Sequence, residues 1–106
     1  MMTVTPDFIA FYNITQHGLD WPWNLANISA VPSKPGVYVL KTAAGKPQYV
    51  GKSEKDLSSR IRDHYPNDIP AVNLFDWYAT RTAQAADVLE VALIKAYNPP
   101  YNKQVG

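Results

Sequence analysis

Residues 83–97 are rich in alanine, leucine and other helix formers, and this stretch stops at the sequence Asn98-Pro99-Pro100. Alanine and leucine favour helices, whereas a residue that precedes proline is pushed out of the helical conformation. Because the predicted helix has almost no polar face, we expect it to be largely buried. Glu90 lies in its middle, and the positions three and four residues away hold no lysine or arginine. A partner for this acid must therefore come from elsewhere in the fold.

A buried carboxylate without a partner is strongly unfavourable. Glu90 can avoid this cost by taking up a proton, by pairing with a cation distant in the sequence, or by binding a metal ion. The chain has no cysteine, so a metal would be held by oxygen or imidazole ligands, and zinc fingers, iron–sulfur clusters and thiol nucleophiles are excluded. The residues alone leave the three options for Glu90 open.

A β-hairpin is predicted near the middle of the chain. A turn at Pro35-Gly36 precedes the β-branched and aromatic run of residues 37–41, and a second short strand is expected over residues 47–50. If the connecting loop closes symmetrically, Tyr38 lies opposite Tyr49, and a register slip of two residues still leaves both on one face. The hairpin therefore presents two phenols to a common surface.

Three further elements complete the expected core. A helix is predicted from Ser53, which resembles the start of a capping box, to His64, shortly before Pro66. A third strand is predicted over residues 74–80, and Thr82 is placed to cap the last helix. The predicted fold is therefore an α/β fold of the α+β type, with the order β-β-α-β-α and a small three-stranded sheet flanked by helices.

Residues 1–33 are expected to form an N-terminal extension that packs on a core domain of residues 34–106. Aromatic residues punctuate this polar extension, and helical spacing among them suggests a short helix over residues 7–15. The chain of 106 residues has room for one domain, because single cores usually occupy about 100 to 150 residues. We therefore expect no second catalytic domain.

Basic residues are distributed unevenly along the chain. The net charge is only +1, and residues 1–33 contain no lysine or arginine. The next stretch has two acids, Glu54 and Asp56, against a larger set of cations, which are Lys34, Lys41, Lys46, Lys52, Lys55, Arg60 and Arg62. Such an excess attracts a phosphate backbone, although scattered cations can equally well solvate a surface.

The sequence contains no secretory signal at its N-terminus and no run of about 20 apolar residues that would cross a bilayer. Its proportions of apolar and charged residues, 46% and 18%, are ordinary for a globular protein. We therefore expect a cytoplasmic protein that does not enter a membrane.

Three cationic side chains stand at positions suited to a cleft. Arg60 and His64 are one helical turn apart and project from the same face. Either both point into a cleft, or Arg60 pairs with Asp56 and His64 interacts with the helix C-terminus. Lys52 follows Gly51 at the join between strand and helix, where backbone N–H groups favour an anion. The first glycine of a nucleotide-binding loop is missing, so an ATPase is excluded.

Together these residues resemble the GIY-YIG nuclease superfamily, and in particular the N-terminal nuclease domain of UvrC. The two namesake triplets read Gly36-Val37-Tyr38 and Tyr49-Val50-Gly51, with valine in place of isoleucine, an exchange that strand packing tolerates. The similarity runs from Pro35 to the end of the sequence and implies the GIY-YIG fold for this part. The other matched positions are Lys52, Arg60, His64, Glu90 and Asn102.

The resemblance implies hydrolysis of DNA phosphodiester bonds by an activated water. Glu90 is expected to bind one Mg²⁺ or Mn²⁺, because such ions keep several waters and need few carboxylates. Arg60 would neutralise charge on the phosphate through its guanidinium fork. Tyr38 is the expected general base, and Lys52 with a second cation or a metal would lower its pKa from about 10.

Further residues take supporting roles under the same resemblance. Tyr49 and His64 are placed to hydrogen-bond the water or the phosphate, and His64 is the alternative base because its ordinary pKa is about 6.5. Gly36 and Gly51 are expected to support the site, and Asn102 is expected to hold the last turn through hydrogen bonds to the backbone. Contacts with DNA are expected from Lys52, Lys55, Arg60 and Arg62.

The sequence leaves two matters open. A catalytically inactive module that binds nucleic acid or acts as an adaptor would keep the same fold, although the complete set of polar residues favours an enzyme. DNA is the expected substrate, but repair, branched-DNA resolution, restriction and mobile-element cutting are all compatible with the residues. Residues 1–33 resemble nothing assignable, so a protein partner is one expected source of specificity, and the oligomeric state is not predicted.

Overall fold

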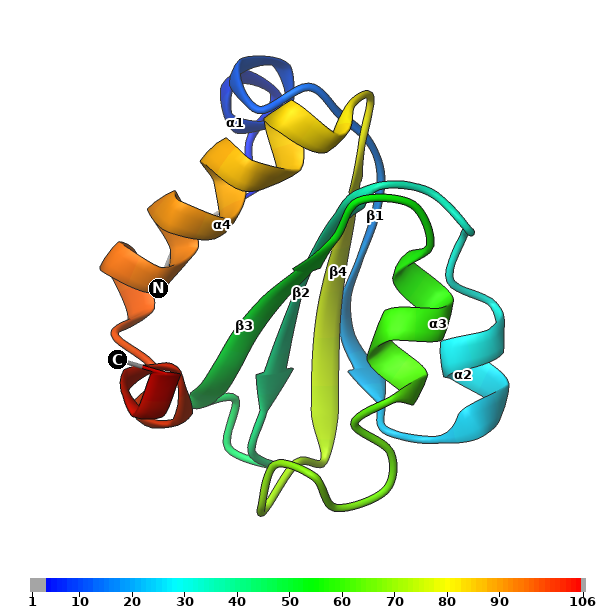
Figure 1. The fold of residues 1–106 in the computed structure, drawn as a ribbon, viewed down its shortest axis with the longest axis vertical. Helices are drawn as coiled ribbons and strands as arrows, with labels where there is room; N and C mark the ends of the chain where they lie inside the picture. Colours follow the sequence, from blue (N-terminus) through cyan, green and yellow to red (C-terminus); the bar gives the residue numbers. More distant parts are fainter. Residues whose placement is uncertain (1–3, 106) are drawn as a thin grey trace.

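The structure, a computed structural model, describes residues 4–105, with side chains through Asn102. Helices cover both faces of a central sheet, with α4 on one side and α2 and α3 on the other (Figure 1). No helix within the described residues is long and apolar enough to span a membrane. In chain order the elements are α1 (Pro6–Phe11), β1 (Ile14–Pro22), α2 (Leu25–Ser29), β2 (Gly36–Lys41), β3 (Pro47–Ser53), α3 (Leu57–Arg62), β4 (Leu74–Thr80), α4 (Ala83–Tyr97) and the 3₁₀ helix η1 (Pro100–Val105).

The sheet has four antiparallel strands in the order β1-β4-β2-β3. Every residue of the interior strand β2 is buried, which explains its almost continuous apolar sequence. Alternate side chains serve two cores, because Tyr38 packs with Ile61 of α3, whereas Val39 packs with Leu89 of α4. The domain is therefore a three-layer structure with the sheet in the middle.

The fourth strand, β1, is the main difference from the expected three-stranded sheet. The sequence predicted a helix over residues 7–15, but α1 ends at Phe11, and Asn13 adopts a left-handed backbone with φ of 55°. Ile14 then starts a strand that pairs with β4. Two register shifts interrupt this pairing, and burial along β1 does not alternate. The segment therefore lacks the period-two signal by which strands are identified.

Strands β2 and β3 form the expected hairpin, with a register displaced by two residues from symmetric closure. Leu40 pairs with Tyr49, and Tyr38 pairs with Gly51. Both tyrosines stay on one face, with ring centroids 6.3 Å apart. A Cβ added at Gly51 would lie 2.3 Å from the Tyr38 hydroxyl, and one added at Gly36 would lie 2.2 Å from a backbone oxygen of β4. Both glycines are therefore required by close approach.

Helix α3 is shorter than predicted at both ends. The Ser53 hydroxyl accepts a hydrogen bond from the Asp56 backbone N–H at 2.9 Å, as in a capping motif. The N-cap of the helix is nevertheless Asp56, whose carboxylate accepts from a backbone N–H of the first turn at 3.1 Å. The helix therefore covers Leu57–Arg62, and it ends before His64. Ser53 orders the loop that leads into it.

Helix α4 begins and ends where the sequence predicted. The Thr82 hydroxyl accepts from the Ala85 N–H at 3.1 Å, and Asn98 ends the helix in a left-handed conformation. The expectation that this helix is largely buried is wrong, because Val88 and Val91 are 53% and 50% exposed. One stripe of the helix contacts the sheet, and apolar residues on the opposite side face outward.

Candidate active site

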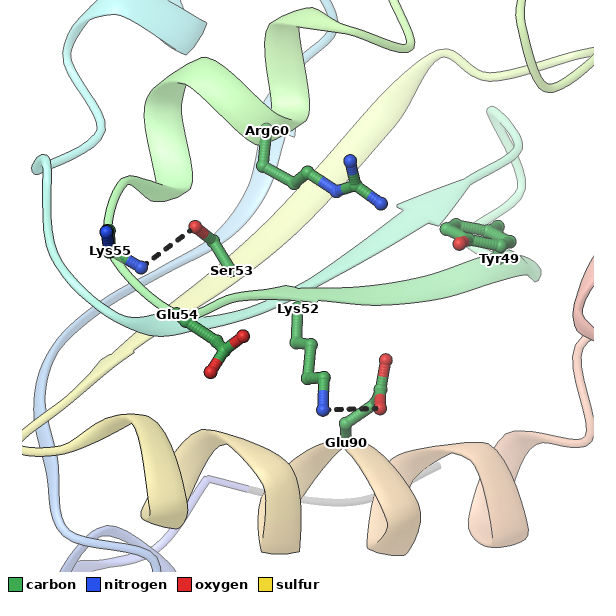
Figure 2. A pocket seen from close by; sticks show the side chains of 7 residues that line it. All are labelled: Tyr49, Lys52, Ser53, Glu54, Lys55, Arg60 and Glu90. Carbon is green, nitrogen blue, oxygen red and sulfur yellow. Dashed lines mark hydrogen bonds and ion pairs between the residues drawn. The ribbon is translucent and has the colours of Figure 1, made fainter.

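A pocket of about 450 Å³ lies at the outer edge of the sheet, around β3. Because β3 is an edge strand, side chains from both faces of the sheet reach around it. Arg60 approaches from α3 on one side, and Glu90 approaches from α4 on the other (Figure 2). Residues far apart in the sequence therefore share one concave surface. The lining residues are Tyr49, Lys52, Ser53, Glu54, Lys55, Arg60 and Glu90.

Glu90 presents its carboxylate to this pocket. Its side chain is 22% exposed, so the acid is half-buried rather than enclosed. Burial raises the pKa of the carboxyl, and the charge of Lys52 acts against this effect. Lys52 Nζ is 4.0 Å from Glu90 Oε1 but only 2.5 Å from Asp87 Oδ1. Of the three expected ways to satisfy Glu90, pairing with a cation distant in the sequence is present, and this cation is Lys52. The main partner of Lys52, however, is Asp87.

The donors around Glu90 fit a hard divalent cation. Such an ion usually keeps several waters and takes only one or two carboxylates from the protein. Within the described part of the chain, no group of three histidine, aspartate or glutamate side chains is placed to form an all-protein metal site. A half-exposed carboxylate at an open polar pocket therefore suits a hydrated Mg²⁺-like ion better than a closed structural zinc site.

Arg60 points from α3 toward Tyr49 and into the pocket (Figure 2). Its ion pair with Asp63 is long, 3.9 Å, and both side chains are more than half exposed. Surface pairs of this kind contribute little and are readily exchanged. The alternative pairing of Arg60 with Asp56 is not formed, because Asp56 caps α3. The guanidinium can therefore turn to a phosphate that enters the pocket.

Tyr38 and His64 lie beside Tyr49 but do not line the pocket. Tyr38 is fully buried, and its hydroxyl oxygen is 2.8 Å from His64 Nε2. The other ring nitrogen, His64 Nδ1, is 2.7 Å from Asp68 Oδ2. The structure thus links a phenol, an imidazole and a carboxylate in one chain of hydrogen bonds.

The pKa of Tyr38 is shifted upward, in the direction that makes its phenol harder to deprotonate. Burial, followed by the neighbouring Tyr49, raises the pKa of the Tyr38 phenol, while Arg60 acts in the opposite direction. Lys52 was expected to lower this pKa, but it donates to Asp87 instead. The cation that acts on Tyr38 is therefore Arg60, and the expected tuning role of Lys52 is not supported.

The other predicted residues differ in their distance from the pocket. Lys55 lines it, whereas Arg62 donates a hydrogen bond to the Ser29 hydroxyl at 3.3 Å and lies outside it. Asn102 is joined to β3 by two hydrogen bonds of 2.8 Å. Its side-chain oxygen accepts from the Val50 N–H, and its side-chain nitrogen donates to the Val50 carbonyl. Asn102 therefore ties η1 to the strand around which the pocket is built.

Several neighbours of the predicted residues were missed at the level of the sequence. Asp87 precedes Glu90 by three residues in the predicted helix, so helical spacing was an available signal for it. Asp68 follows His64 by four residues but lies beyond Pro66, where the predicted helix has ended, so it had no such signal. The two other missed residues line the pocket where β3 ends and the loop to α3 begins, and they are Ser53 and Glu54. No spacing rule applies to the junction between a strand and a loop, so these two had no comparable signal.

A family model described as the UvrC-like GIY-YIG domain matches residues 34–103. The chain belongs to this family. The matched residues include every side chain that lines the pocket, together with Tyr38, His64 and Asn102. Membership confirms the family, the fold and the nuclease class that were predicted from the sequence.

Known relatives of this UvrC-like domain agree with the match. UvrABC system protein C of Clostridium acetobutylicum is 34% identical in an alignment 93 residues long, which covers 78% of this chain and 14% of that protein. The same protein of a Thermoanaerobacter species is 38% identical over 85 residues, again 14% of its length. The chain therefore spans a small part of the curated relatives that it matches.

Solved structures resemble the UvrC-like domain as well. The GIY-YIG N-terminal endonuclease domain of UvrC from Thermotoga maritima, bound to its catalytic divalent cation, magnesium, has a TM-score of 0.61 and 33% identity. The similarity covers 72% of this chain and 91% of that one. A point mutant of the same domain gives a TM-score of 0.63 at 31% identity.

Proposed function

We propose that this UvrC-like domain is a divalent-cation-dependent endonuclease that hydrolyses DNA phosphodiester bonds. The observation that carries the proposal is the meeting of the Glu90 carboxylate, the Arg60 guanidinium and the Lys52 ammonium in one pocket. Phosphodiester hydrolysis requires stabilisation of charge on the phosphate and activation of a water. The charged groups supply the stabilisation, and the adjacent tyrosine hydroxyls are available for the activation.

Glu90 would hold one Mg²⁺, and Mn²⁺ would replace it because both ions prefer oxygen ligands. When bound, the cation supplies electrostatic stabilisation of the leaving 3′ oxygen. The magnesium in the Thermotoga maritima domain supports this assignment. Glu90 itself serves to fix the position of the positive charge relative to Arg60, which stands on the opposite side of β3.

Arg60 would bind the non-bridging phosphate oxygens, because its planar fork matches their geometry. Lys52 and Lys55 line the same pocket and would hold the DNA backbone on either side of the scissile bond. Burial raises the pKa of Tyr49, with Arg60 opposing, so its phenol stays protonated and can donate a hydrogen bond. Arg62 lies outside the pocket and would contact DNA only at the edge of the DNA-binding surface.

Tyr38 and His64 were alternative bases at the level of the sequence. Their hydrogen bond of 2.8 Å supports a joint role instead, in which the phenol accepts the proton of the water and passes its own proton to the imidazole. The proton of that water must leave as its oxygen attacks the phosphorus. The linked phenol and imidazole accomplish this without requiring either residue to act alone.

The test of this function is the variant Glu90→Gln, which removes the negative charge but keeps the size of the side chain. We expect Mg²⁺-dependent cleavage of DNA to be lost, while the thermal unfolding transition and DNA binding in EDTA are retained. Glu54→Gln is the matched control, because Glu54 lines the same pocket from a loop. Full Mg²⁺-dependent cleavage by Glu90→Gln would reject the assignment of the metal ligand.

The choice of DNA substrate needs a separate experiment. Supercoiled, linear, single-stranded and branched DNA should be incubated with the wild-type chain and Mg²⁺ or Mn²⁺, with EDTA as the control. We propose that the isolated domain cuts with low selectivity and that a protein partner supplies specificity. Strong preference for one DNA form would contradict the need for such a partner, and binding without cleavage would favour a non-catalytic module. The cytoplasmic location stays a prediction.

A further inference from the structure

We propose that Asp68 is a positioning residue, which fixes the tautomer of His64 and thereby makes the Tyr38 hydroxyl the donor in the bond between them. This inference rests on the proposed nuclease function for its purpose, but its geometry stands independently. The three groups form one chain, with 2.8 Å from the Tyr38 hydroxyl oxygen to His64 Nε2 and 2.7 Å from His64 Nδ1 to Asp68 Oδ2.

The direction of each hydrogen bond follows from the capacity of its groups. A carboxylate can only accept, so the proton between Asp68 and His64 must be carried by Nδ1. A neutral imidazole has one N–H, so Nε2 then presents a lone pair. The partner of that lone pair is the Tyr38 hydroxyl, which must donate. Asp68 therefore determines the orientation of a hydroxyl that it does not touch.

The local backbone holds this arrangement in place. The Asp68 N–H donates to the His64 carbonyl at 3.1 Å, so the two residues are one turn apart although α3 has already ended. The His64 side chain is 11% exposed, which leaves the ring little freedom to rotate, whereas Asp68 is 58% exposed at the surface. A surface acid thus controls an imidazole that is nearly buried.

The consequence for catalysis concerns the raised pKa of Tyr38. The step requires the attacking water to reach the Tyr38 hydroxyl, which is buried beside the pocket-lining Tyr49. With its own proton directed to His64, the Tyr38 oxygen has lone pairs left to accept a proton from that water. As that proton arrives, the phenolic proton passes to His64 Nε2, the new hydroxide oxygen bonds to phosphorus, and the bond to the 3′ oxygen breaks with its electron pair. The imidazolium later returns its proton to solvent. Tyr38 never has to carry a full phenolate charge.

The first test reads the tautomer directly and does not depend on activity. The chain has two histidines, so nitrogen-15 long-range spectra of the imidazoles, assigned with the variant His64→Gln, identify the ring of His64. At a pH where the imidazole is neutral, we expect the Nδ1–H form in the wild type and a shift to the Nε2–H form in Asp68→Ala. Asn67→Ala, an exposed neighbour in the same loop, should leave the spectrum unchanged. An Nε2–H form in the wild type, or no change in Asp68→Ala, overturns the proposal.

The second test asks whether the tautomer matters for cleavage. We expect Asp68→Ala to lower kcat by about tenfold or more with little change in KM, by analogy with the effect of carboxylates that orient metal-bound histidines. Asp68→Glu should restore part of the rate. In a His64→Gln background, Asp68→Ala should have no further effect, because the two residues act in series. Equal losses in both backgrounds would mean that Asp68 is merely structural. A chain without any nuclease activity would fail the proposed function and leave the spectroscopic result intact.

Discussion

Lys52 stands between two acids of α4, and this position decides how it can meet DNA. The hydrogen bond to Asp87 is the main cause that raises the pKa of Lys52, with Glu90 adding to it. The ammonium therefore keeps its charge at neutral pH. A phosphate that enters the pocket must compete with Asp87 for the same Nζ atom, 2.5 Å away. Because both side chains are partly exposed, this competition is modest in energy.

We expect Asp87→Asn to tighten DNA binding, because the substitution removes the charge that competes with phosphate for Lys52. Fluorescence anisotropy in EDTA should show a dissociation constant lower by about two- to fivefold, the range of a surface ion pair. The dependence of log Kd on log salt should steepen as one more phosphate contact forms. Asp7→Asn, in the first turn of α1, is the control. An unchanged salt dependence would show that Lys52 does not reach the DNA.

The candidate residues of the site followed from the sequence, but their partners did not. Glu90 was singled out because an acid in an apolar helix conflicts with burial, and this argument needs no coordinates. The ion pair of Lys52 with Asp87 depends instead on the crossing of β3 over α4, which the sequence pattern does not specify. The contact of Tyr38 with His64 was not predictable for the same reason, because it depends on how α3 packs on the sheet. Tertiary partners therefore had to come from the structure.

A buried ion pair joins three strands of the sheet, β1, β2 and β4. Lys41 of β2 and Asp76 of β4 are 3% and 4% exposed, and their charged atoms are 2.8 Å apart. Lys41 also contacts Asp20 of β1, whose backbone N–H donates to Asp76 at 2.8 Å. Two carboxylates raise the pKa of Lys41 despite its burial. The cluster therefore attaches β1 to the rest of the sheet.

We expect Lys41→Met to lower the free energy of unfolding at neutral pH by about 3–5 kcal/mol, because Asp76 is left as an uncompensated buried charge. Burial already raises the pKa of Asp76, and loss of the cation must raise it further. The folded variant then binds the proton more tightly than the unfolded chain. Its stability deficit should therefore shrink as the pH falls through the folded pKa toward the ordinary aspartate value of about 3.9.

Urea denaturation at neutral and acidic pH measures both effects of Lys41→Met. Lys46→Met is the control, because this lysine is exposed in the turn between β2 and β3. It should change stability little at either pH. An equal deficit for Lys41→Met under both conditions would show that Asp76 is not its cause.

Elements with strong local signals were predictable, and β1 was not. The bounds of β4 and α4 match the sequence analysis. Thr82 caps the start of α4 and separates this helix from β4, and Asn98, which precedes two prolines, ends it. β1 contains Gly18, whose added Cβ would lie 2.4 Å from the Trp77 ring nitrogen. The strand is thus selected by tertiary contact with a tryptophan, which local propensity does not reveal.

At the scale of the whole molecule, the family domain and the folded unit have different limits. The family match covers residues 34–103, which include β2, β3 and β4 but not β1. β4 lies between β1 and β2, so one edge of β4 is covered by a strand that lies outside the matched range. β1 also brings Trp21 against Trp77, with ring centroids 5.2 Å apart. We propose that the N-terminal extension is needed to complete the sheet rather than only to pack on it.

Removal of residues 1–24 should therefore destabilise the domain and expose the edge of β4. We expect a lower thermal transition and a higher proportion of aggregate in size-exclusion chromatography, because an uncovered strand edge pairs with other chains. Removal of residues 1–12 is the matched control, since it spares β1 and should cause the smaller loss. If both truncated chains behave alike, β1 does not stabilise the sheet.

The edge of the sheet opposite β1 is formed by β3, and a side chain rather than another strand pairs with it. Asn102 meets Val50 as a peptide group of a fifth strand would, with one acceptor and one donor. An open border next to a reactive pocket would invite a strand of another molecule and block the entry of DNA. A single carboxamide occupies that pairing position instead. The candidate catalytic groups can thus lie at an outer strand, accessible from both faces of the sheet, while Asn102 occupies one of the positions at which another strand would pair.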